Sequence, residues 1–133
     1  MKKKILNIIQ NIDLICPNGE ILTIQAKLDT GAYSSSIDIG LVKKYNFLYL
    51  NKKKEINSAS GKTLRPIYEC VFILSEKKII TEVVAIDRSN LKFPMIIGRR
   101  NMSGFFIRPR CFSNSNIDVD QDTELIISDF SIK

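Results

Sequence analysis

The sequence predicts an all-β protein, a small and mostly antiparallel β-barrel with one or two short helices. Three hairpin-like segments support this fold class, and helical periodicity is sparse along the 133 residues. A chain of this length is expected to form one domain with a single hydrophobic core. We therefore assign residues 1–111 to the barrel domain, and residues 112–133 to an acidic linker followed by a C-terminal strand.

The first predicted hairpin joins residues 5–15 to residues 20–28. An Asn-Gly pair between two mainly apolar segments is the strongest short-range hairpin signal, and Asn18-Gly19 provides it here. The second strand of this hairpin leads directly into Asp29. One or two helical turns are expected at residues 41–45.

The middle of the chain predicts a charged loop and then another hairpin. Residues 51–62 carry charges and serines without an apolar period, so we expect a loop there, with a hairpin tip at 57–62 as the alternative. Residues 66–74 and 79–86 have the pattern of two paired strands. Further elements are expected as follows: a core strand at 93–97, a short helix at 98–102 and a strand at 105–107.

Composition restricts the possible classes of function. No apolar run approaches the roughly 20 residues of a membrane span, and no secretory signal is evident, so we expect a cytoplasmic protein without a membrane partner. The three cysteines are widely spaced and odd in number, which favours reduced thiols. The chain has no His, which disfavours a catalytic zinc site and excludes Ser-His-Asp and Cys-His mechanisms. We expect no metal and no cofactor.

The net charge of +6 is unevenly distributed. Basic residues dominate residues 41–66, whereas acidic residues dominate residues 118–129. A basic body indicates an anionic partner, which could be nucleic acid, an acidic peptide or the protein's own acidic segment. Nucleic acid is the weakest of these, because no Trp is present and no stretch interleaves cations with aromatic residues.

Residues 26–36 are the part of the chain where residue types and spacing together indicate chemistry. An apolar strand stops at Asp29, and Thr30 and Gly31 follow it in a turn before three consecutive serines. A turn glycine gives the backbone room for another chain to approach. Such a tripeptide on its own is more often a simple turn with local hydrogen bonds. A second motif, Ile96-Ile97-Gly98, follows more than sixty residues later.

The two motifs together resemble the retropepsin-like aspartic proteases. The match is closer to a bacterial branch known as ATP-dependent zinc proteases, through further short segments. These segments are Ala26-Lys27, Arg65-Pro66, Asp87-Arg88, Lys92-Phe93-Pro94 and Gly98-Arg99. The resemblance covers roughly residues 10–110, and it implies a retropepsin-type barrel.

The resemblance implies a role for each residue of the first motif. Asp29 would be the catalytic acid, the Thr30 hydroxyl would tie two such loops together, and the Gly31 backbone would contact substrate. Ala32, Ser34 and Ser35 would line the substrate site, although small polar residues in a tight turn have a purely structural explanation as well. Since peptide hydrolysis by carboxylates needs two acids, an active enzyme would be a homodimer acting on a peptide or protein.

The arginines near these motifs leave two interpretations open. Arg65, Arg88, Arg99 and Arg100 are either ordinary surface residues or a rim that binds carboxylates, since Arg grips planar anions with two parallel hydrogen bonds. The resemblance implies acidic or glutamyl-rich peptides as substrates. The alternative function is a catalytically inactive barrel that binds an anionic peptide or partner protein.

Overall fold

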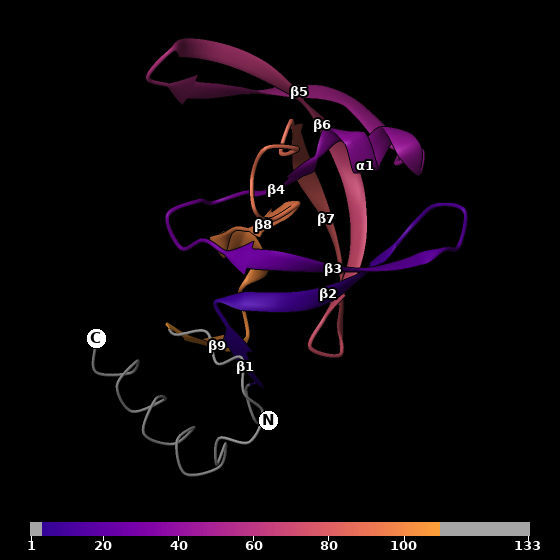
Figure 1. Cartoon of the computed structure of the whole chain (residues 1–133), viewed down its shortest axis with the longest axis vertical. Coiled ribbons are helices and arrows are strands. Elements are labelled where there is room, and N and C mark those ends of the chain that lie inside the picture. Colours follow the sequence, from indigo (N-terminus) through magenta and orange to yellow (C-terminus); the bar gives the residue numbers. More distant parts are fainter. Residues whose placement is uncertain (1–3, 110–133) are drawn as a thin grey trace.

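The computed structural model describes residues 4–109 and contains a closed β-barrel (Figure 1). Its elements are, in chain order, β1 (Lys4–Asn7), β2 (Ile9–Ile15), β3 (Ile21–Leu28), β4 (Ser35–Asp38), α1 (Ile39–Lys44), β5 (Tyr49–Ser58), β6 (Gly61–Leu74), β7 (Lys77–Ile86), β8 (Met95–Ile97), the 3₁₀ turn η1 (Arg99–Asn101) and β9 (Phe105–Arg108). The predicted all-β class with one short helix is therefore confirmed.

Six strands close the barrel in the order β2-β3-β8-β4-β7-β6, because β6 also pairs with β2. The β2–β3 and β6–β7 hairpins form as predicted. Most pairings are antiparallel, but β3–β8, β4–β7 and β1–β9 are parallel. Hairpin signals in the sequence do not report such pairings, because parallel partners lie far apart in the chain.

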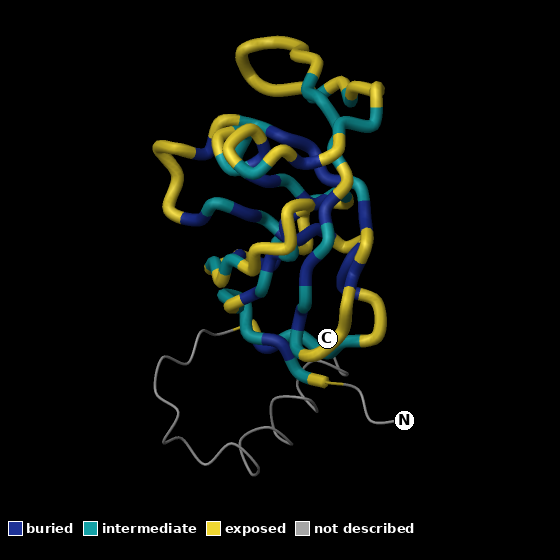
Figure 2. Tube along the Cα trace, turned by 90° about the vertical axis from the view of Figure 1, so that its right-hand side faces the viewer, coloured by how far each residue is buried: buried dark blue, intermediate teal, exposed yellow. Residues whose placement is uncertain are grey.

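Two expectations about the strands were wrong. The segment at residues 5–15 is not one strand: it divides into β1, which pairs with β9, and β2, which pairs with β3. Residues 51–62 are not a loop, because most of them belong to the antiparallel hairpin β5–β6; the alternative, a hairpin tip at 57–62, is confirmed, with Ser58 opposite Gly61. The outer part of this hairpin, residues 51–64, projects from the barrel and is mostly exposed (Figure 2), so it has no apolar alternation to detect.

The barrel interior is filled by aliphatic and aromatic side chains from nearly every strand. Leu14, Phe72, Leu74, Met95 and Ile97 are among its fully buried members. Cys16 and Cys70 are also buried, and both are free thiols. Burial is the main cause that raises the pKa of the Cys70 thiol to about 12, which favours its neutral, unreactive form. Cys111 and the expected C-terminal strand in residues 112–133 lie outside the described residues.

Strand β8 lies between β3 and β4, and this insertion fixes the loop of residues 29–34 (Figure 1). Gly98, directly after β8, packs against the backbone of that loop. A Cβ atom at Gly98 would lie 2.5 Å from the Tyr33 carbonyl oxygen and 2.6 Å from the Ser34 carbonyl carbon and oxygen. Only a residue without a side chain fits there, because the opposing atoms belong to the main chain.

Replacing Gly98 with Ala should therefore lower the free energy of unfolding by about 2–3 kcal/mol, the cost of overpacking a rigid site. Urea denaturation of the variant would measure the loss. Gly40→Ala is the control, because in α1 a new Cβ meets only the Asp38 side chain, at 3.1 Å from Oδ2. That change should stay within about 1 kcal/mol of the parent protein. Equal stability of the two variants would contradict the proposed close packing.

Candidate active site

The Asp29 carboxylate lies at the end of β3, where the chain leaves the barrel. The Asp29 backbone N–H donates to the Ile97 carbonyl at 2.9 Å, which fastens the start of the loop to β8. The Gly31 N–H donates to Asp29 Oδ1 at 2.9 Å, and the Ala32 N–H donates to the Asp29 carbonyl at 3.1 Å. These bonds hold a half-buried carboxylate in one orientation at the rim of the barrel.

Thr30 and Gly31 form the exposed outer part of the loop. Within residues 4–109 the Thr30 hydroxyl makes no hydrogen bond, but Arg99 Nη1 donates to the Thr30 carbonyl at 2.8 Å. The Arg99 guanidinium carbon also lies 5.9 Å from the centroid of the Tyr33 ring. The Arg99 side chain therefore braces the outside of the loop.

A buried polar contact supports the loop from inside the barrel. Ser35 is fully buried, donates from Oγ to Asn101 Oδ1 at 2.6 Å, and accepts a hydrogen bond from the Gly98 N–H at 3.0 Å. The Arg99 N–H donates to the Ala32 carbonyl at 2.8 Å, which adds a main-chain link between the same two segments. Ser35 was expected to line the substrate site, whereas in the structure it faces inward and joins β4 to η1.

The projecting hairpin reaches the loop through one side chain. Lys54, on β5, donates from Nζ to Ser34 Oγ at 2.8 Å. Arg65 lies directly opposite Lys54 in the β5–β6 pairing. The structure therefore brings one cation of the hairpin, Lys54, to the Asp29 loop. Hydrogen bonds from Ser89 and, to a smaller extent, the charge of Arg65 lower the pKa of Asp87, so Arg65 acts on that carboxylate.

The remaining arginines are dispersed around the site. Arg88 is buried, and its Nε donates to the Phe93 carbonyl at 2.8 Å. Burial lowers the pKa of Arg88, and the charges of Asp38 and Asp29 oppose that shift. Arg88 therefore stabilises the chain around residues 87–93 and does not belong to an exposed rim, because its side chain is enclosed. Arg100 turns toward Glu82 on β7, at 3.8 Å.

Three residues near the site were missed in the sequence. Asn101 lies between arginines and Met102, Tyr33 follows the recognised motif, and Lys54 belongs to a run of three lysines. Asn101 comes two residues after Arg99 of the recognised motif, and this proximity could have identified it. No sequence pattern marks which lysine of the run reaches across to Ser34.

The described residues hold neither a cluster of metal ligands nor a membrane-spanning helix. Among residues 4–109, no three His, Cys, Asp or Glu side chains gather in a way that could hold a metal ion. The donor groups in this part of the chain therefore do not fit a zinc site. The same residues contain no helix of the length and hydropathy required to cross a membrane.

The barrel with β8 inserted beside an Asp-Thr-Gly loop defines a retropepsin-like fold, and solved structures agree. A Legionella pneumophila protein with unknown function matches with a TM-score of 0.55 and 21% identity, over 81% of this chain and 94% of its own. The simian foamy virus protease matches with a TM-score of 0.50 and 14% identity, over 70% and 91%. The EIAV protease complexed with the inhibitor HBY-793 matches with a TM-score of 0.51 and 15% identity, over 69% and 83%.

These identities are low, so the matches establish the fold and nothing finer. No protein-family model matches the chain, and no curated protein matches it. The resemblance to the ATP-dependent zinc protease branch therefore gains no support from the comparisons, whereas the predicted retropepsin-type barrel is confirmed.

The Ser35 contact can be tested with its neighbour as a matched control. Ser35→Ala should lower the free energy of unfolding by about 1–3 kcal/mol, because it leaves the buried Asn101 oxygen and the Gly98 N–H without their partner. Ser36→Ala should change it by less than about 0.5 kcal/mol, since the half-buried Ser36 side chain makes no hydrogen bond with the described residues. Chemical denaturation of both variants gives the comparison, and equal losses would refute the role assigned to Ser35.

Proposed function

We propose that this protein is a homodimeric aspartic endopeptidase in which each subunit contributes Asp29. The observation that supports this proposal best is the orientation of the Asp29 carboxylate. It is fixed by the Gly31 N–H at 2.9 Å and lies on a loop that β8 and Gly98 hold rigid from behind. A catalytic group works best when its supporting structure prevents it from moving.

The proposed dimer follows from the chemistry of the reaction. Two carboxyl groups must share one proton across a water molecule, and the described chain has one Asp-Thr-Gly loop. A two-fold axis beside that loop would bring Asp29 of both subunits together, in the arrangement that is commonest among homo-oligomers. The Thr30 hydroxyl would then donate across the axis to the partner's loop.

In the proposed mechanism a water molecule attacks the peptide carbonyl carbon, and the ionised Asp29 carboxylate of one subunit takes a proton from that water. The protonated carboxyl of the other subunit donates to the carbonyl oxygen, which gives a tetrahedral intermediate. As the intermediate collapses, the carboxyl group that took the proton from water gives it to the leaving nitrogen, the other carboxylate takes a proton from a hydroxyl of the intermediate, and the C–N bond breaks. The Gly31 backbone and Ala32 would position the substrate strand beside the two acids.

We further propose that the substrate is an acidic or glutamyl-rich peptide. Lys54 and Arg99 contact the Asp29 loop, and neither of them forms an ion pair within 4.0 Å among residues 4–109. An acidic substrate would supply carboxylates to these two cations.

Asp29→Asn is the direct test of the proposal. The variant should lose at least about 10³-fold in kcat on an acidic peptide library, because it cannot act as a base, while its stability and peptide binding are retained. Asp13→Asn, on β2 away from the loop, is the control and should keep full activity.

Light scattering of the parent protein should give the mass of a dimer. A monomer, or full turnover by Asp29→Asn, would exclude the mechanism and favour a binding barrel.

The pH profile provides an independent test. Since the reaction needs one carboxyl protonated and the other ionised, the rate should fall on both sides of an acidic to near-neutral optimum. Initial rates measured between about pH 3 and pH 9 would show the bell shape. A rate that rises steadily into alkaline solution would contradict the two-carboxyl mechanism.

A further inference from the structure

Three hollows lie along β7, and they share one exposed isoleucine. Their volumes are about 240, 350 and 270 Å³, and Ile80 lines all of them. Ile80 is 63% exposed, and Leu48, which lines the 350 Å³ hollow, is 57% exposed. Adjoining exposed apolar side chains over connected hollows are typical of a surface that another segment covers.

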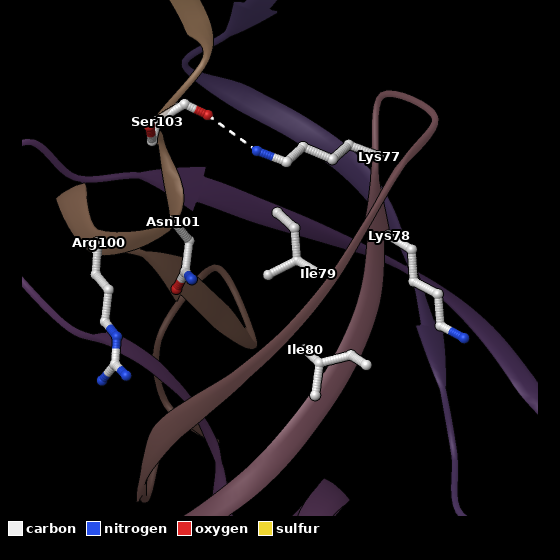
Figure 3. Close-up of a pocket in the computed structure, with 7 residues that line it drawn as sticks. All are labelled: Lys77, Lys78, Ile79, Ile80, Arg100, Asn101 and Ser103. Carbon is white, nitrogen blue, oxygen red and sulfur yellow. Dashed lines mark hydrogen bonds between the residues drawn. The ribbon is translucent and has the colours of Figure 1, made fainter.

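The surface is bordered by three cations, Lys77, Lys78 and Arg100, and by two carboxylates, Glu69 and Glu82. Figure 3 shows the 240 Å³ hollow with Lys77 and Ile79 of β7 on one side, and Arg100, Asn101 and Ser103 on the other. Lys77 Nζ donates to the Ser103 carbonyl at 3.2 Å, which leaves its charge uncompensated by a carboxylate. Lys78 lines two of the hollows and forms no ion pair with the described residues. We refer to Leu48, Lys77, Lys78, Ile80 and Arg100 as the β7 surface.

The chemistry of the β7 surface defines what can bind it. Exposed apolar side chains beside two lysines that form no ion pair with the described residues, Lys77 and Lys78, fit an extended segment whose apolar residues are flanked by carboxylates. Such a segment occurs once in this chain, in residues 117–129, which lie outside the described residues. It contains Leu125-Ile126-Ile127 together with five acidic residues, which are Asp118, Asp120, Asp122, Glu124 and Asp129.

We propose that residues 117–129 bind the β7 surface of the same chain. Leu125, Ile126 and Ile127 would cover Ile80 and Leu48, and the carboxylates would face Lys77 and Lys78, since Arg100 is already paired with Glu82. Residues 117–129 account for five of the fourteen acidic residues of the chain, so the opposing body is strongly basic. The charge imbalance favours binding of this segment to its own body.

The chain length permits this arrangement. The Phe105 ring at the start of β9 lies 5.5 Å from Lys77 Nζ, so β9 starts beside the 240 Å³ hollow. The strand carries the chain away over four residues, or about 13 Å. The ten residues from Pro109 to Asp118 can span about 30 Å when extended. The acidic segment can therefore return to the surface without displacing any described strand.

Hydrogen exchange of the full-length protein at low salt tests this proposal. Amides in residues 117–129 should exchange at least tenfold more slowly than in a free peptide of the same sequence. Lys78→Glu and Ile80→Asp should each remove most of that protection, because one reverses a charge and the other removes the apolar contact. Raising the salt to about 1 M should weaken the protection in the parent protein, since screening shortens the range of charge attraction.

Lys53→Glu is the matched control, because Lys53 is an exposed β5 residue that lines none of these hollows. It makes the same charge change as Lys78→Glu and should leave the protection intact. Protection that rises with protein concentration would show that a second copy supplies the segment, which overturns binding within one chain. The proposal would also be overturned if the amides of residues 117–129 exchanged as fast in the parent protein as in the free peptide. Equal losses of protection in Lys53→Glu and Lys78→Glu would overturn it as well. Asp29 plays no part in these measurements, so their outcome is independent of catalysis.

Discussion

The close contact between Gly98 and the main chain of Tyr33 and Ser34 is the constraint on which the rest of the site depends. A backbone approach this close brings β8 into register between β3 and β4, and thereby lets Asp29 bond to Ile97. The loop of residues 29–34 and the end of β8, which are remote in the sequence, thereby form a single rigid unit. The orientation of the carboxylate thus depends on the barrel that holds the loop as well as on the local hydrogen bond from the Gly31 N–H.

The site combines a buried support with an exposed working face. Ser35 and Asn101 are enclosed, where a hydrogen bond is costly to lose, while Thr30 and Gly31 remain open to solvent. Arg99 and Lys54 approach the loop from outside and hold it through a carbonyl and a hydroxyl oxygen. This division separates the residues that maintain the geometry from those available to another molecule.

The sequence predicted the parts of the fold that are local. Asn18-Gly19 and the alternation along β6 identified two hairpins, because turn chemistry and burial of one face leave a direct pattern. The β5 strand escaped detection, because neither of its faces enters the core. At the site, the Asp29 motif was recognisable, whereas the inward direction of Ser35 and the enclosure of Arg88 arise from pairings between distant segments that no short pattern records.

The parallel pairing of β3 with β8 has a further consequence, for the order in which the molecule is made. Ala26 pairs with Met95, so about 70 residues separate the two halves of this contact. Pairings this remote form late, because a long loop must be closed before any contact compensates for its entropy. During synthesis the Asp29 loop leaves the ribosome well before Gly98 does. The nascent chain therefore carries its acid without the scaffold that orients it, and the finished geometry appears only when the domain is nearly complete.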